Sequence, residues 1–302
     1  MSGQARETVL VTGASSQLGV FLLPRLQAAG YGVLALSRKA PAASLEVAPN
    51  VTWSRPDTLD RVSPGPLRHI VSCGPLELAC DFLESRAPIE RAVVFSTSSV
   101  LAKLDTPDRD ESRRLAAIAR TEIRLRAVCA RAGTALLLLR PTLIWGCGLD
   151  RNISLLARFG RRFGFIPVAG DAGGLRQPVH ADDLASLAVQ ALGAQPPIEL
   201  ESPACGGSTL TYRAMVERIA GCGEKRVSVV SLPGSLLGGL VALSSRLPGL
   251  DSLNAEMVRR QGQDMTFDDS TLRDALGSTP RPFEPRPADF VVPPIAAALQ
   301  LP

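Results

Sequence analysis

The stretch TVLVTGASSQLGVFLLPRLQAAGYGVLALSR, residues 8–38, decides the fold of this chain. An apolar run at 9–11 ends in a turn that carries Gly13 and Gly19, and a helical pattern follows before a second apolar run at 33–36. The order strand, glycine-bearing turn, helix and strand lays a pyrophosphate against backbone N–H groups at a helix N-terminus. Gly13 suits the tight turn, and Gly19 lets the helix pack closely on the sheet.

The turn predicts a dinucleotide site, with one deviation. The middle glycine of the usual fingerprint is Ser16 here, so an ordinary strand–helix turn without a ligand remains an alternative. The residues expected to hold the cofactor lie in this turn, after the second strand and near the ends of three later strands. They are Gly13, Ser15, Ser16, Gln17, Leu18, Gly19, Ser37, Arg38, Asp57, Cys73, Gly74 and Pro141.

The residues after the second strand indicate which nicotinamide cofactor the site takes. A carboxylate at that place hydrogen-bonds a ribose 2′-hydroxyl, whereas a guanidinium suits a 2′-phosphate. The chain has Ser37, Arg38 and Lys39 there, with no nearby acid. Arg38 therefore favours NADP over NAD, although a lone arginine after a strand is also a common surface residue.

Length and composition limit the class of protein. A chain of 302 residues with 45% hydrophobic residues is expected to form one large α/β domain with an appended lobe. Its net charge of +4 is small for this length and does not indicate a nucleic-acid partner. The six cysteines lack metal-ligand spacing and there are only two histidines, so we expect no metal site and a reduced, cytoplasmic protein.

No stretch predicts a membrane span. The most apolar late stretch, residues 232–250, is interrupted by Gly, Ser, Arg and Pro. It falls short of the length that a bilayer requires, and a core or interfacial helix is the better interpretation.

The rest of the first half alternates strands with helices. We expect strands at 51–53, 69–72, 92–95 and 135–139 and helices at 76–86 and 111–132. This spacing predicts an α/β fold with a doubly wound parallel sheet of the Rossmann type, which binds ligands at the carboxyl ends of its strands.

The second half has a different composition, with a Gly- and Arg-rich segment after the sixth strand. Further strands are expected at 177–180 and 199–203, helices after 180 and at 209–221, and a tail that is proline-rich from Pro280. The predicted division is a dinucleotide-binding domain at 1–150, to which 177–200 returns, and a smaller C-terminal substrate lobe. That lobe comprises 151–176 and 201–302.

Several motifs, taken in order, resemble the extended short-chain dehydrogenase/reductase superfamily, in particular its NAD-dependent epimerase/dehydratase family. They are Thr12-Gly13-Ala14 with Gly19, the Ser/Thr-rich 96–99, Arg140-Pro141-Thr142 with Ile144 and Gly146, the run 177–185, and the late 267–277 with 280–282. The resemblance implies a Rossmann domain that binds NAD(P) and a smaller lobe that receives a nucleotide-sugar or similar small molecule. It is also compatible with a homodimer.

One motif of that family is missing. Members normally carry Tyr-x-x-x-Lys on the helix after the fifth strand, where the lysine holds the ribose and lowers the pKa of the tyrosine. Aligning Glu122 with the glutamate that commonly follows the motif puts Arg114 at the tyrosine position and Ile118 at the lysine position. The only tyrosines, Tyr31 and Tyr212, have no lysine four residues later, so the usual acid/base group is absent.

Two residues are candidates for catalysis without that group. Thr97 matches the family position that hydrogen-bonds the substrate hydroxyl, and Lys103 is the nearest cation that could substitute. Their alternatives are a hydroxyl that caps a strand end and a solvated loop lysine. Cys147 and His180 also invite catalytic roles, but a structural thiol and a structural residue at the domain junction are favoured.

Polar residues of the Arg-rich segment are the candidates for substrate binding. The resemblance places this segment in the wall of the substrate lobe, where a guanidinium can grip a diphosphate with two hydrogen bonds. The candidates are Arg151, Asn152, Arg162 and Arg176. A basic helix face turned to water is the alternative.

Three functions follow from these patterns, and the fold alone does not choose among them. The first is an NADP-dependent reductase, epimerase or dehydratase with unconventional acid/base groups, acting on a small anionic ligand such as a nucleotide-sugar. The second is a sensor that keeps the NADP site and has lost turnover. The third is a scaffold subunit that inherits the fold.

Overall fold

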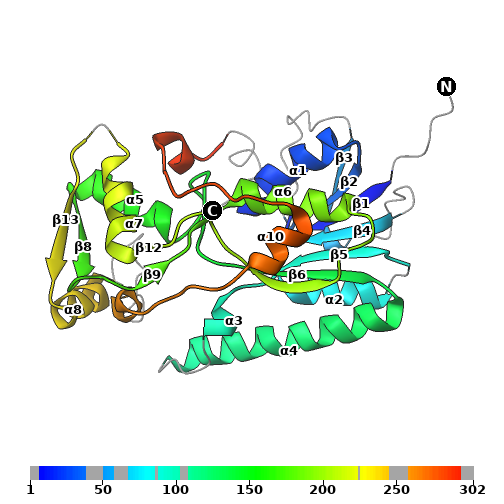
Figure 1. Cartoon of the computed structure of the whole chain (residues 1–302), viewed down its shortest axis with the longest axis horizontal. Helices are drawn as coiled ribbons and strands as arrows, with labels where there is room; N and C mark the ends of the chain where they lie inside the picture. Colours follow the sequence, from blue (N-terminus) through cyan, green and yellow to red (C-terminus); the bar gives the residue numbers. More distant parts are fainter. Residues whose placement is uncertain are drawn as a thin grey trace.

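A seven-stranded sheet and a smaller lobe beside it make up the computed structural model of the chain (Figure 1). The structure describes residues 7–38, 50–57, 67–85, 88–102, 108–223, 225–244 and 258–293, and within 240–244 the backbone only.

All strands of the large sheet are parallel, in the order β11-β6-β5-β4-β1-β2-β3. They are β1 (Thr8–Thr12), β2 (Gly32–Leu36), β3 (Val51–Ser54), β4 (Leu67–Ser72), β5 (Arg91–Phe95), β6 (Ala135–Pro141) and β11 (Leu200–Ala204). The strand order reverses between β1 and β4, which creates the switch point where this class of sheet binds ligands. The prediction of a doubly wound parallel sheet is confirmed.

Helices cover both faces of this sheet, which explains why its central strands are apolar throughout. One face carries α1 (Gln17–Ala28), α6 (Ala181–Gly193) and α10 (Ser270–Leu276), and the other carries α2 (Leu76–Ser85) and α4 (Arg109–Ala132) (Figure 1). The short α3 (Ser99–Ala102) follows β5. Asp108 caps α4 by accepting the N–H groups of residues 110 and 111, and Gly133 ends the helix with φ 67°.

The small lobe packs helices on one side of a two-stranded parallel sheet. Its main elements are α5 (Ile153–Phe163), β8 (Phe165–Ala169), α7 (Tyr212–Gly221), β13 (Ser228–Leu232) and α8 (Gly234–Ser244). Its core includes Ile166, Met215 and Phe283, which are fully buried. Short strand pairs join it to the main sheet: β7 (Ile144–Trp145) with β10 (Val179–His180), and β9 (Leu175–Arg176) with β12 (Leu210–Thr211).

The boundary at residue 200 differs from the sequence-based division. β11 lies in the large sheet beside β6, and α10 packs on α6 and β11, so parts of 201–302 belong to the layers of the large-sheet domain. The expected helix at 209–221 begins only at Tyr212, because residues 210–211 pair with β9. The described part of the chain contains no helix long and apolar enough to cross a bilayer.

Candidate functional site

Two glycines fix the turn between β1 and α1. Gly13 adopts φ 64°, and a Cβ atom there would lie 2.5 Å from the backbone nitrogen of Gly74. A Cβ on Gly19 would lie 2.0 Å from the carbonyl oxygen of Ala14. Neither position has room for a side chain, so both glycines are required by close backbone approach.

Ser16, which replaces the middle glycine, caps α1. Its hydroxyl accepts the N–H of Gly19 at 3.3 Å, which satisfies one of the unpaired donors at the start of the helix. Within the described chain, nothing accepts a hydrogen bond from the N–H groups of Ser15, Gln17 and Leu18. Unpaired N–H groups at a helix N-terminus are the arrangement that binds phosphate, so the turn fits the pyrophosphate of a dinucleotide.

The end of β2 lies beside this turn. The Ser37 hydroxyl donates to the Ser15 hydroxyl at 2.9 Å, and Arg38 follows as an exposed side chain. Asp57 is exposed and accepts from Arg55 at 3.0 Å. Cys73, after β4, donates its N–H to Thr12, and burial raises the pKa of its thiol to about 12. Lys39 lies outside the described residues.

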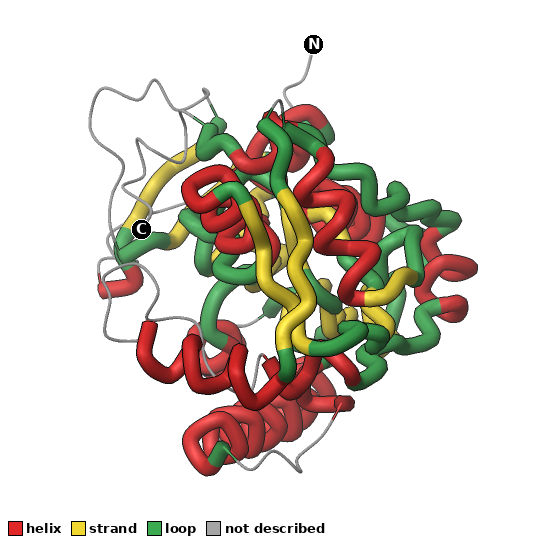
Figure 2. Tube along the Cα trace, turned by 90° about the vertical axis from the view of Figure 1, so that its left-hand side faces the viewer, coloured by secondary structure: helices red, strands yellow, loops and turns green. Residues whose placement is uncertain are grey.

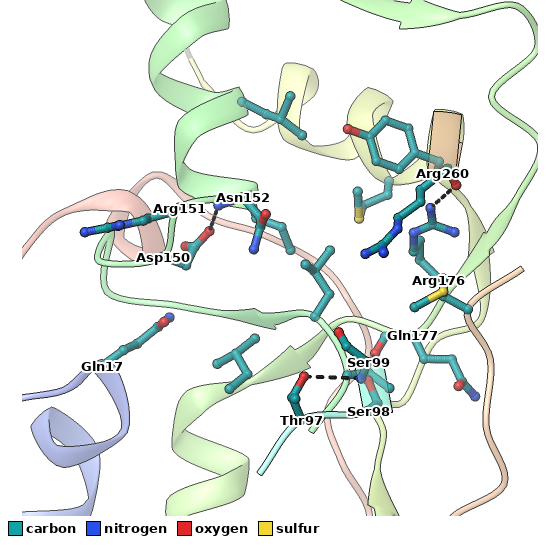
Figure 3. A pocket seen from close by; sticks show the side chains of 18 of the residues that line it. Gln17, Thr97, Ser98, Ser99, Asp150, Arg151, Asn152, Arg176, Gln177 and Arg260 are labelled. Atoms are coloured by element: carbon teal, nitrogen blue, oxygen red, sulfur yellow. Dashed lines mark hydrogen bonds between the residues drawn. The ribbon is translucent and has the colours of Figure 1, made fainter. Parts of the chain in front are cut away.

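A cavity of about 620 Å³ lies between the carboxyl ends of the strands and the small lobe. In Figure 3, Gln17 of α1 and Arg151 stand on one side and Arg176 and Arg260 on the other, with Asn152 and Thr97–Ser99 between them. The structure thus brings one cofactor candidate, one catalytic candidate and three substrate candidates to the same space. Its apolar wall contains Leu143, Ile144, Ile153, Leu156, Met215 and Met265.

The polar loop after β5 is held by hydrogen bonds from several directions. Ser98 donates its N–H to the Pro141 carbonyl at 3.0 Å, and Ser99 donates its N–H to the Thr97 hydroxyl oxygen at 3.2 Å. Ser96 donates its hydroxyl to Glu122 at 2.6 Å, and the buried Arg140 donates to the same carboxylate at 2.7 Å. Among the described residues the Thr97 hydroxyl accepts this bond and donates none, so its proton can reach a ligand.

Arg114 and Ile118, which the sequence comparison aligned with the tyrosine and lysine of the Tyr-x-x-x-Lys motif, lie in different environments. Arg114 lines the cavity, whereas Ile118 packs into the core between the sheet, α2 and α4. Glu111, one turn before Arg114, has only 13% of its side chain exposed and forms ion pairs with Arg260 at 2.8 Å and with Arg114 at 3.7 Å. This carboxylate therefore links α4 to the 3-10 helix Arg260–Gly262 across the cavity wall. Lys103 lies outside the described residues.

The substrate candidates occupy different environments. Arg151 and Asn152 are exposed at the cavity. Arg176 is buried and donates to the carbonyls of Gln263 and Arg260 at 2.6 and 2.5 Å, with its guanidinium 5.4 Å from the ring centre of Tyr212. Its charge faces the cavity, but several of its donors are already used.

Arg162 lies apart from the other substrate candidates. It is not among the residues that line the main cavity, and its guanidinium lies 5.5 Å from the ring centre of Phe163. Arg162 lies in the last turn of α5, on the outer side of the lobe. The side of this helix that faces the cavity carries Ile153 and Leu156.

His180 and Cys147 sit in structural positions at the junction of the two parts. His180 is buried, caps α6 by accepting the N–H of Asp182 at 3.1 Å, and packs edge-on against Trp145. Burial lowers the pKa of His180, and it raises the pKa of the buried Cys147 thiol to about 11. Neither group is prepared for acid/base or nucleophilic work near neutral pH.

The sequence alone did not identify Glu111, Arg260 and Tyr212 as cavity residues. In the sequence, Glu111 marks only the start of an expected helix, and Arg260 belongs to no motif. Their association depends on segments about 150 residues apart in the chain coming together, which no local pattern records. Among the described residues, no cluster of His, Cys, Asp and Glu is arranged to hold a metal ion.

Comparison with known proteins defines the fold. No protein-family model matches the chain. An uncharacterized protein of Sinorhizobium fredii, y4nG, is 27% identical in an alignment 309 positions long. The alignment covers 92% of this chain and 76% of that protein.

Several solved structures share the fold at low sequence identity. MoeE5 in complex with UDP-glucuronic acid and NAD is 20% identical, with a TM-score of 0.67 and 97% of both chains covered. The UDP-glucuronic acid 4-epimerase of Bacillus cereus, in complex with UDP-glucuronic acid and NAD, is 15% identical, with a TM-score of 0.66 and 97% of both chains covered. The terminal R domain of the myxalamid PKS-NRPS pathway is 19% identical, with a TM-score of 0.69 over 96% of this chain and 90% of that one. The chain has the α/β fold of these proteins.

Proposed function

We propose that the chain is an NAD(P)-binding member of the extended short-chain dehydrogenase/reductase superfamily that acts on, or senses, a small anionic ligand of the nucleotide-sugar class. One observation carries the proposal. A single cavity joins Gln17, at the dinucleotide turn, and Thr97, at the end of β5, to a wall that bears Arg151 and Arg260. A dinucleotide on α1 and an anion held by these arginines would meet in that space.

The cofactor site is built from three parts of the chain. The N–H groups of Ser15, Gln17 and Leu18 would hold the pyrophosphate, with Gly13 and Gly19 shaping the turn. Ser37 and Arg38 would hold the adenosine ribose, and Arg38 favours a 2′-phosphate and hence NADP over NAD. Asp57, Cys73, Gly74 and Pro141 complete the proposed contacts. The nicotinamide, when bound, supplies a hydride donor or acceptor.

The substrate side has a proposed anion site. Arg151 and Asn152 are exposed at the cavity and free of ion pairs among the described residues, so they would contact a phosphate directly. Arg176, whose donors bond to carbonyls, would contribute its positive charge. MoeE5 and the Bacillus cereus epimerase, which share the fold, hold UDP-glucuronic acid, and this supports a nucleotide-sugar here.

Proton transfer would need groups other than a tyrosine on α4. The Thr97 hydroxyl would donate to a substrate oxygen, and Lys103 is the proposed cation beside it. Glu111 and Arg114 occupy the α4 face where the acid/base group would stand. This arrangement also supports the second candidate function, a cofactor-binding sensor or scaffold subunit without turnover.

A turnover assay separates the enzyme from the sensor. Oxidation of NADPH is followed with simple carbonyl compounds, and reduction of NADP⁺ is followed with UDP-glucuronic acid and UDP-glucose, whose hydroxyl-bearing carbons can give up a hydride. The enzyme proposal predicts turnover that Thr97→Ala or Lys103→Ala lowers at least tenfold, in line with the usual contribution of a proton-transfer group. Binding without any turnover supports the sensor. Full activity in both variants contradicts the roles given to these residues.

A binding assay tests the substrate class separately. UDP-glucuronic acid is titrated into the protein with NADPH present, and Arg151→Ala is expected to weaken binding about tenfold because a charge-assisted contact is lost. Arg131→Ala, an exposed arginine in the last turn of α4, serves as the control and should bind as the wild type does. Equal effects of the two variants would refute the anion site.

A further inference from the structure

Cations and phenylalanines gather on the outer side of the small lobe, away from the large sheet. Arg161 and Arg162 end α5, and Lys225 and Arg226 precede β13. The phenylalanines are Phe159, Phe163 and Phe165, from the end of α5 and the start of β8. We call this surface, which contains these seven residues, the lobe end. It lies on the left in Figure 1.

The aromatic rings of the lobe end remain open to solvent. Phe163 and Phe165 are 47% and 39% exposed, although phenylalanine is usually buried. The Phe159 ring centre lies 4.6 Å from that of Phe163 and 5.8 Å from that of Phe165, so the three rings form one cluster. Arg162 stacks over Phe163. The core of the lobe is complete without Phe163 and Phe165.

The four cations outnumber the acidic residues of their two segments: 159–170 contains none, and 222–232 contains only Glu224, which lies outside the described residues. All are exposed, and none forms an ion pair with an acidic residue of the described chain. Arg161 and Lys225 line the same cavity of about 310 Å³, whose floor includes Ile166, Ile219 and Phe290, so the two basic segments lie side by side. An excess of positive charge beside an apolar cavity attracts anionic amphiphiles.

The sheet beside the lobe end continues the apolar surface. The β8–β13 register sets Phe165, Pro167 and Val230 on the outer face, where Val230 is 38% exposed, and Ile166 and Val168 on the inner face. Figure 2, which looks onto this end of the molecule, shows two long strands running across its front.

Helix α8 packs at the far end of the same strands. It contains no charged residue, and Leu237 packs against Val258 while Leu236 is 52% exposed. Leu236 therefore adds an exposed apolar side chain at this end of the strands.

We propose that the lobe end docks on an anionic membrane surface. The four cations would meet lipid phosphates, while Phe163, Phe165 and Leu236 would enter the boundary between headgroups and acyl chains. The excess of positive charge beside exposed aromatic rings favours an anionic lipid surface. The proposal does not depend on the nucleotide site, which lies on the other side of α5.

Vesicle flotation with the full chain tests the proposal. We expect binding to vesicles of phosphatidylcholine and phosphatidylglycerol in equal parts, and little to phosphatidylcholine alone. Arg161→Gln with Arg162→Gln should weaken the partition on the order of tenfold or more, since each surface cation contributes about fivefold. Phe163→Ser with Phe165→Ser should weaken it about as much, because two exposed rings lose their apolar contact. High salt should release the wild type.

Matched variants elsewhere on the surface control for net charge and hydrophobicity. Arg113→Gln with Arg131→Gln removes two exposed cations from α4, and Ile123→Ser removes a 62% exposed apolar side chain. These should float as the wild type does, and circular dichroism should show all variants folded. The proposal is wrong if the wild type does not bind the vesicles, or if the control variants lose as much vesicle binding as the test variants. If the protein does not bind vesicles but self-associates, and the phenylalanine variant abolishes that association, the lobe end contacts a second copy of the chain instead of a membrane.

Discussion

At the end of α4 that lines the cavity, the Glu111 carboxylate pairs with two arginines. Without this carboxylate, both guanidinium groups would be available to a ligand. Glu111 forms an ion pair with Arg260 at 2.8 Å and a longer one with Arg114 at 3.7 Å. An anionic ligand entering this part of the cavity must compete with that carboxylate for the same guanidinium groups. Glu111 is therefore expected to limit how tightly such a ligand binds.

Glu111→Gln tests this competition. The variant should bind UDP or inorganic phosphate about three- to tenfold more tightly than the wild type, because one partly buried charge is worth roughly 1 kcal/mol. Calorimetric titration at low salt measures the change. Glu90→Gln, an exposed glutamate that pairs with Arg68, is the control and should bind as before. Weaker binding in Glu111→Gln would mean that Glu111 orients the arginines for the ligand.

Residues with local roles could be predicted from the sequence, and residues with remote partners could not. Gly13 and Gly19 stand out because the turn itself demands them, and Thr97 stands out because it ends an apolar strand. The pair Glu111–Arg260 could not be predicted, since its members are joined only by the tertiary fold. Whether Thr97 and Arg151 act on a substrate stays a prediction.

At the scale of elements, a buried ion pair connects α4, β6 and the loop after β5. The Glu122 and Arg140 side chains are only 4% and 7% exposed, and the carboxylate also accepts from Ser96. Glu201 of β11 bonds to the same arginine at 2.8 Å. The pair therefore fixes the strand end from which Thr97 projects.

Glu122→Gln should destabilise the protein strongly. Removing one partner of a buried pair leaves Arg140 with less compensation, at a cost of about 3 kcal/mol. Urea unfolding monitored by fluorescence gives the value. Glu84→Gln, which removes a fully solvated partner of Arg124, should leave stability nearly unchanged. Similar losses in both variants would show that the buried pair contributes no more than a surface one.

Elements of the large sheet were predictable, and those of the small lobe only in part. Parallel strands covered on both faces appear as apolar runs, so β1, β4, β5 and β6 are evident in the sequence. The β8–β13 pair joins segments about 60 residues apart and contains a proline and serines, so no continuous apolar run in the sequence predicts it. The sequence predicts a strand at 199–203, but its pairing with β6 and the packing of α10 on the same layers are long-range contacts, so the predicted boundary falls at 200.

At the scale of the whole molecule, charged contacts tie remote segments together. Asp182 at the start of α6 accepts from Arg25 of α1 at 2.6 Å and from Arg281 of the late chain at 2.8 Å. Burial alone would raise the pKa of Asp182, but these two hydrogen bonds outweigh it and lower the pKa. Hydrogen bonds from Arg126, and next from Arg140, lower the pKa of Glu201 to about 2.

Acid should therefore lower the stability of the folded protein at pH values below the usual pKa range of carboxylates. A carboxylate with a lowered folded-state pKa contributes stability that is present above its unfolded value, 4.5 for Glu201, and is lost as the pH falls toward about 2. Thermal melting at a series of pH values should show this decline. In Glu201→Gln the decline should be shallower, whereas the exposed neighbour variant Glu199→Gln should follow the wild type. Parallel curves for all three proteins would contradict the assignment.

The central claim is that the β1–α1 turn binds NAD(P), and calorimetric titration of the apo protein with NADPH and NADH tests it most directly. We predict that NADPH binds more tightly than NADH and that Arg38→Ala weakens NADPH binding about tenfold or more, since a 2′-phosphate loses its charged partner. NADH should be little affected by the variant. If neither nucleotide binds protein shown to be free of carried-over ligand, the account is contradicted, and the fold serves as a scaffold.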